Sequence, residues 1–246
     1  MQKYLQIEKA SARLPEHFHT AVIMGRISSM PWPATHILIA EQLYARYFSH
    51  LDQPAFIIGT CFPDIRYPAR IGRELTHYSG LTLSQISAQP AFQAGMSFHT
   101  FVDQHWNGYV RAHHTRLFAK LPHNRAIFHT MKILQDKYLY HEIDAWRQVA
   151  SYFDEVLPEE HAFGIDAGML ELWHTMLSNY LQKPPNFEDL NMLSLSLPDD
   201  LLSEIRGYCQ IYEHLPALKQ VMIGFYVEFT DLLGSDPYSR KDSPTV

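Results

Sequence analysis

The chain has 246 residues, of which 46% are hydrophobic, so it can bury the core of one large domain or two small ones. Its 20 Lys and Arg residues stand against 26 Asp and Glu residues, giving a formal net charge of −6 with no basic block, which argues against binding to a nucleic-acid duplex. Two cysteines cannot build a disulfide framework, and this usage favours a reducing compartment such as the cytoplasm.

The two ends of the chain differ from the rest of it. Residues 1–29 carry scattered charges, and "MPWPATHILIAEQ" from Met30 reads like a chain start, so we expect an N-terminal extension over these residues. They do not have the pattern of a secretory signal, and no run approaches the ~20 apolar residues that span a bilayer. Residues 234–246 are turn formers with little apolar content, which predicts a disordered tail. We therefore expect a cytoplasmic domain at 30–233 with no transmembrane segment.

Helical periodicity dominates this central region, without convincing strand alternation or repeats. The first helix is expected at 35–50, with Thr35 as its N-cap. A short helix or turn, a loop and a second short helix that reaches His77 should follow, because three prolines interrupt the chain there: Pro54, Pro63 and Pro68. Further helices are predicted at 90–115, 123–154, 165–182, 198–213 and 216–233. The fold class is therefore all-α, with one helical domain.

The stretch "GMSFHTFVDQHW" at 95–106 places an imidazole and a carboxylate among core-forming residues. His99 and Asp103 are four residues apart, so they project from one side of a helix and can reach a common ion, with Gly95 one turn earlier leaving room. A buried His bonded to an Asp at i+4 is also a common structural pair. Taken alone, the spacing favours that structural pair over a metal site.

Three more polar residues have two interpretations each. Asp64 lies in a loop bracketed by prolines, where its carboxylate can ligate a metal or simply form a turn and pair with Arg66. His77 ends a predicted helix, where the helix dipole favours a protonated imidazole. His36 follows the expected N-cap, a poor place for a cation, so it is better used neutral, as a ligand or a hydrogen-bond donor.

The order and spacing of these residues say more than any one of them. Thr35-His36 opens a helix, "F-x-x-G-x-x-F-P-D" follows at 56–64, His77 lies 13 residues after Asp64, and "G-x-x-x-H-x-x-x-D" spans 95–103. Over residues 31–140 this pattern resembles the zinc-dependent phospholipase C family, which is related to the fungal zinc-dependent single-strand nucleases. The C-terminal hundred residues match that family only in being helical.

The resemblance implies a phospholipase C-like multi-helix bundle with a metal cleft, in which zinc-activated water cleaves a phosphoester. Asp64 would bridge ions and orient the attacking water. The positions of the family's metal ligands fall on His36, Asp64, His77, His99 and Asp103.

Ligands beyond Asp103 have no clean counterpart in the sequence. The candidates are His129 and Asp136, seven residues apart and nearly on one helix face, or the adjacent pair His141 and Glu142, and we favour the first pair. Secreted members of the family also use a mature N-terminal Trp as a ligand, whereas Trp32 is internal here. We therefore expect one or two zinc ions rather than three.

These observations predict a zinc-dependent phosphoric ester hydrolase acting on a phospholipid or another small phosphoester. Arg66, Arg70 and Arg73 can bind a substrate phosphate, although a solvated helix face is the account that their spacing favours. The alternative is a non-catalytic helical protein that kept the fold with a structural or lost metal site. Phosphohydrolases built on a His-Asp dipeptide are disfavoured because the chain lacks that dipeptide. The sequence indicates neither the substrate nor the oligomeric state.

Overall fold

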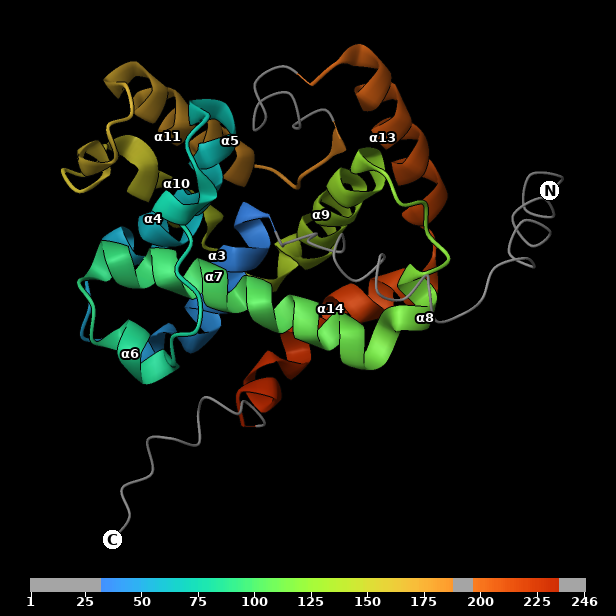
Figure 1. Cartoon of the computed structure of the whole chain (residues 1–246), viewed down its shortest axis with the longest axis horizontal. Coiled ribbons are helices and arrows are strands. Elements are labelled where there is room, and N and C mark those ends of the chain that lie inside the picture. The colour runs from blue at the N-terminus through green and yellow to red at the C-terminus, as the bar shows by residue number, and fades with distance from the viewer. Residues whose placement is uncertain (1–31, 188–196, 235–246) are drawn as a thin grey trace, which may run out of the picture.

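Helices are the only regular elements in the part of the chain that the structure, a computed structural model, describes: residues 32–187 and 197–234 (Figure 1). This confirms the predicted all-α class and a single helical domain for these residues. The α-helices are α3 (Pro33–Leu43), α4 (Gln53–Cys61), α5 (Arg66–Ala69), α6 (Leu83–Ser87), α7 (Ala91–Tyr109), α8 (Thr115–Phe118), α9 (Arg125–Leu139), α10 (Trp146–Ser151), α11 (Ala167–Leu181), α13 (Asp199–Tyr212) and α14 (Pro216–Gly234).

Short helical segments link several of these helices. Two π-helical segments directly follow α3 and α7: η1 (Tyr44–Phe48) and η4 (Val110–His114). The 3-10 segments are η2 (Phe62–Ile65), η3 (Arg73–Leu75), η5 (Tyr140–Glu142), η6 (Tyr152–Asp154) and η7 (Glu160–Phe163). With η1 and η4 included, the helices predicted at 35–50 and 90–115 agree with the structure, as do the three predicted after residue 165.

The prediction of one helix over 123–154 is wrong. Helix α9 ends at Leu139, and α10 begins only at Trp146, after an extended residue at Ile143. The Trp146 ring stacks on Tyr140 at 4.9 Å between centroids, and its indole Nε1 donates to the Tyr140 carbonyl at 2.6 Å. The sequence has no Pro or Gly at this break. The contact between Trp146 and Tyr140 stabilises it instead, and that contact forms only when the chain folds back on itself.

The predicted N-cap of the first helix is also wrong. Trp32 is the N-cap of α3, and Pro33 occupies the first helical position, where a missing N–H costs nothing. Thr35 instead donates its hydroxyl to Asp136 Oδ1 at 2.6 Å. The same carboxylate accepts the backbone N–H groups of Ala34 and Thr35, so a residue of α9 caps this helix.

Helices α4 and α7 cross at two glycines. A Cβ added to Gly95 would lie 2.2 Å from the Phe56 carbonyl oxygen, and one added to Gly59 would lie 2.1 Å from the Phe92 carbonyl oxygen. The sequence led us to expect that Gly95 leaves room for an ion. Instead, the backbone of α4 fills that space. This close approach lets side chains of α7 reach backbone groups of α4.

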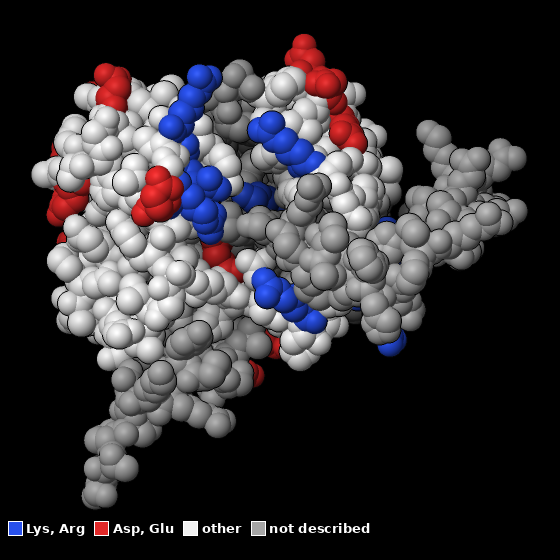
Figure 2. Space-filling view, in the orientation of Figure 1, with Lys and Arg blue, Asp and Glu red and all other residues white. Residues whose placement is uncertain are grey.

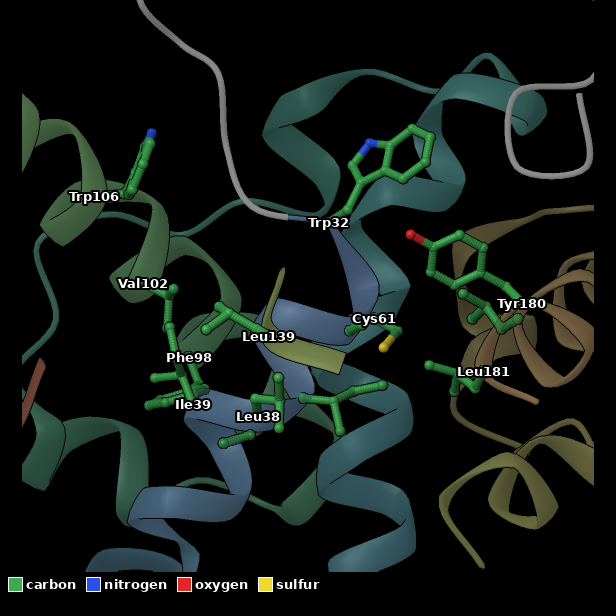
Figure 3. Close-up of a cluster of buried hydrophobic side chains, with 14 of the residues drawn as sticks. Trp32, Leu38, Ile39, Cys61, Phe98, Val102, Trp106, Leu139, Tyr180 and Leu181 are labelled. Carbon is green, nitrogen blue, oxygen red and sulfur yellow. The ribbon is translucent and has the colours of Figure 1, made fainter. Parts of the chain in front are cut away.

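The core surrounds α3, which runs through the middle of the molecule (Figure 1). Leu38 and Ile39 of α3 lie in one buried cluster with Phe98 of α7 and Leu139 of α9 (Figure 3). Near the start of α3, the Trp32 ring packs edge-on against Tyr180 at 5.8 Å. The polar residues that α3 and α7 turn toward each other are thus held by a rigid apolar frame.

The Pro-rich segment folds into α4, η2, α5 and η3. The predicted second helix is two short pieces, and it does not reach His77, because η3 ends at Leu75. Helix α5 ends at Ala69, and its C-cap residue Arg70 is left-handed with φ 54°. The expected extension at 1–29 lies outside the described residues. So does the predicted tail, apart from Gly234 at the end of α14. Within the described ranges, no helix is both long and apolar enough to cross a bilayer.

Candidate metal centre

Three buried side chains from α3 and α7 meet at one point. His36, His99 and Asp103 each offer one ligand atom, and these atoms lie within 4.8 Å of one another. His36 Nε2 is 3.4 Å from Asp103 Oδ1, and His99 Nε2 is 3.5 Å from Asp103 Oδ2. The two imidazole rings stack at 4.0 Å between centroids. The sequence predicted these three residues as ligands, and the structure brings them together.

The orientation of His99 depends on the crossing of α4 and α7. Its Nδ1 lies 3.0 Å from the Thr60 carbonyl oxygen, which can only accept a hydrogen bond, so the proton belongs on Nδ1. The Nε2 lone pair therefore faces Asp103, and this nitrogen is buried without a hydrogen bond. A histidine held through one nitrogen by a carbonyl is the usual arrangement of a metal ligand.

His77 is held in the same way next to this group. Its Nδ1 lies 2.9 Å from Thr76 Oγ1, and the Thr76 hydroxyl donates to the Pro63 carbonyl at 3.4 Å. The Thr76 oxygen thus accepts the Nδ1 proton. His77 Nε2 is buried without a hydrogen bond and lies 3.9 Å from Asp103 Oδ2.

Asp64 lies in η2, beside the three histidines. Its Oδ1 is buried and has no hydrogen-bond partner. Burial alone would raise the pKa of this carboxyl, but the positive charge of Lys132, followed by interactions with the three histidines of the site, brings the pKa below its ordinary value of 3.8. Asp64 is therefore an ionised carboxylate at neutral pH.

Burial shifts the other titrating groups in ways that also favour a cation. It lowers the pKa of His99 to about 4 and that of His77 to about 3, so both rings are neutral. It raises the pKa of Asp103 to about 7, an effect that Asp64 increases and His99 opposes. Neutral imidazoles and crowded carboxylates together form a site to which a positive ion would bind.

His129 and Asp136 do not join this group. The carboxylate of Asp136 accepts four hydrogen bonds, three from Ala34 and Thr35 and one from the Tyr180 hydroxyl at 2.8 Å. It positions the helix that carries His36. His129 lies beside Trp32, at 6.5 Å between ring centroids, and the adjacent His141 and Glu142 form an exposed 3-10 turn.

Sequence reasoning missed Lys132. This lysine is only 7% exposed, lies on α9 and acts electrostatically on both Asp64 and Asp103. Its position within the apolar run "MKIL" was the available signal, because a buried lysine is rare unless it is paired.

Basic side chains lie near the site at the surface. Arg73 Nη2 lies 3.8 Å from Asp103 Oδ2, and its side chain is 43% exposed. Lys and Arg side chains gather around a hollow in the surface, in the region between α5 and α9 (Figure 2). An anionic ligand would be attracted to this face although the whole chain is acidic.

Comparison of the chain with known protein families, curated proteins and solved structures found no match. The function of this site must therefore be inferred from its own geometry and chemistry.

Proposed function

We propose that the protein is a metal-dependent hydrolase of the phospholipase C type, which cleaves a phosphoester. The observation that supports this most is a set of buried polar atoms without hydrogen bonds: His77 Nε2 and His99 Nε2, which face the two oxygens of Asp103, and Asp64 Oδ1 in the neighbouring segment η2. Buried polar groups are nearly always hydrogen-bonded, and a shared ion is the simplest partner for this set.

The donor atoms suit zinc. The site combines imidazole and carboxylate, and the nearby Cys61 thiol has a pKa well above its ordinary value, chiefly through burial, so it is not a competing ligand. His36, Asp64, His77, His99 and Asp103 are enough for one or two ions. A bound zinc would lower the pKa of a water to about 7 and offset the charge of a phosphate.

The residues around the ion would carry the remaining steps. Arg73, beside Asp103 at the opening, is placed to hold a phosphate oxygen. The ionised Asp64 can accept a hydrogen bond from the attacking water and so hold it in line with the phosphorus. His77 and His99, each anchored through Nδ1, keep the ligand atoms in place.

The rival function is a helical protein with a structural metal. The side chains of His36, His99 and Asp103 are only 1–2% exposed, and such burial is also typical of closed structural sites. A structural site would have four protein ligands around the ion, whereas a catalytic site would keep one position for water.

Asp64→Asn is the test of the proposed function. Protein purified without a His tag should contain about one to two equivalents of zinc and hydrolyse a generic chromogenic phosphodiester. The variant should fold, bind zinc more weakly and lose at least about 100-fold in activity, because the negative charge beside the ions is gone.

Asp144→Asn is the matched control, since Asp144 is exposed and is not one of the proposed ligands. It should change neither zinc content nor rate. If the Asp64 variant binds zinc and turns over substrate as the parent does, the ligand assignment is wrong. Zinc without any hydrolysis in the parent would favour the structural role.

A further inference from the structure

Lys132 has a largely buried side chain that forms no salt bridge with a described residue. No carboxylate of the described residues lies within salt-bridge distance of its Nζ, which instead lies 5.8 Å from the centre of the Tyr67 ring. The Lys132 stem is buried, but its Nζ is not among the buried side-chain atoms that lack a hydrogen bond, so the ammonium group keeps contact with solvent. Tyr67 lies just after η2, the segment that contains Asp64, so this contact places the cation close to the proposed metal site.

Arg66 lies against the same ring. Its guanidinium carbon is 3.9 Å from the Tyr67 ring centre, Nη2 donates to the Tyr67 hydroxyl, and Nε is buried without an acceptor. One aromatic ring thus faces two cations that repel each other. An anion bound beside Tyr67 would offset both charges and supply the missing acceptor for Arg66 Nε.

The charge of the whole site points the same way. One divalent ion would offset Asp64 and Asp103, which leaves Lys132 and Arg66 as an excess of positive charge. A phosphodiester with one negative charge does not balance this excess. A choline or ethanolamine group would add to it.

We infer that Lys132 and Arg66, which both lie against the Tyr67 ring, bind a second anionic group of the substrate. The substrate is then a phosphoester whose alcohol part carries a carboxylate or a further phosphate, and not one with a cationic head group. This inference rests on the proposed function for the place of the first phosphate. The positions of Lys132 and Arg66 are seen in the structure and do not depend on that proposal.

Three probes with one phosphate each test the charge preference: phosphocholine, glycerol phosphate and phosphoglycerate, whose other ends are cationic, neutral and anionic. Their dissociation constants are measured by calorimetry on zinc-loaded protein and again after zinc removal. Affinity should rise about tenfold at each step of the series, and the order should persist, at weaker affinity, without zinc. Equal affinities for the three compounds would overturn the inference.

Lys132→Met removes the charge and keeps the approximate length of the side chain. The dissociation constants of the three probes should then differ by less than about threefold. Lys132→Arg should restore the order, which guards against a packing defect in the first variant. The control is Lys137→Met on the same helix, because Lys137 is paired with Glu213 at 3.0 Å and 38% exposed. It should leave the series unchanged.

The outcomes separate this inference from the proposed hydrolysis. Ordered binding that depends on Lys132 supports the anion site even if the parent hydrolyses nothing. If the parent hydrolyses the substrate but Lys132→Met shows the same order of affinities as the parent, the proposed function stands and the anion site is rejected.

Discussion

Asp103 is the residue on which the candidate site depends. Its two oxygens face the Nε2 atoms of His36, His77 and His99 at 3.4 to 3.9 Å, distances too long for good hydrogen bonds. Each histidine comes from a different segment, and Asp103 lies within 4 Å of all three. A carboxylate with this many imidazole neighbours is arranged for an ion between them.

The pH dependence of zinc binding should report on Asp103. Its pKa in the absence of an ion is about 7, so below pH 7 zinc must displace one proton and the affinity falls about tenfold per pH unit. Above pH 7 the affinity should be level. His99 and His77, with pKa values of about 4 and 3, are already neutral and add no slope between pH 5.5 and 7. Competition with a chromogenic chelator gives the curve, and a slope of two or three protons would contradict this assignment.

Asp136 should behave as a structural residue. Asp136→Asn replaces one acceptor oxygen by a donor that faces the N–H groups and hydroxyls of α3 and Tyr180. We expect urea unfolding of the metal-free protein to show a loss of about 2–4 kcal/mol in the free energy of unfolding, through unsatisfied buried groups. A variant that loses zinc but keeps the metal-free stability of the parent would instead make Asp136 a ligand.

Among the elements, the crossing of α4 and α7 has the largest effect on the site. The two glycines let the helices approach until Thr60 of α4 can accept the Nδ1 proton of His99. The π-helical segments after α3 and α7 lie beyond the site. The geometry of one ligand is thus a consequence of how two helices pack.

Gly95→Ala should separate these helices. The new Cβ would lie 2.2 Å from a carbonyl oxygen and 2.6 Å from the Thr60 nitrogen, which are backbone atoms that cannot turn away. The melting temperature of the metal-free protein should fall by several degrees, which corresponds to a loss of about 2–4 kcal/mol in the free energy of unfolding. The affinity for zinc should fall with it.

Gly108→Ala provides a control on the same helix. Nothing lies within 4 Å of its added Cβ, so alanine should raise the stability by up to about 1 kcal/mol through helix propensity and leave zinc binding unchanged. Equal effects of the two alanine substitutions would show that close packing at Gly95 is unimportant.

At the scale of the whole molecule, the site joins segments that are far apart in the sequence. His36 belongs to α3, Asp64 to η2, His77 follows η3, and His99 lies on α7. The apolar core holds these segments together without an ion. A bound ion would add to that framework by favouring the folded state.

Removal of zinc should therefore lower the melting temperature without unfolding the protein. At free zinc 100 times its dissociation constant, the stabilisation is about 2.7 kcal/mol, which is several degrees for a domain of this size. Differential scanning calorimetry with and without a chelator measures the shift. The shift should vanish in Asp103→Asn, and a shift that persisted there would place the ion elsewhere.

The sequence by itself determined what depends on neighbours along the chain. The helical periods predicted the all-α class, and the four-residue spacing placed His99 and Asp103 on one side of a helix, because 3.6 residues per turn bring such positions together. The family resemblance then added His36, Asp64 and His77. The ligand roles of these residues stay a prediction, although the structure brings His36, His99 and Asp103 within reach of one ion.

The tertiary structure decided which helix each polar residue faces. Asp136 and Lys132 occupy buried positions of α9, yet one caps α3 and the other lies beside Asp64. The break after Leu139 and the use of Gly95 as a helix contact also had no local signal. Periodicity tells which side of a helix is buried, but the partner on that side is set by the crossing of helices and by contacts between residues distant in the chain.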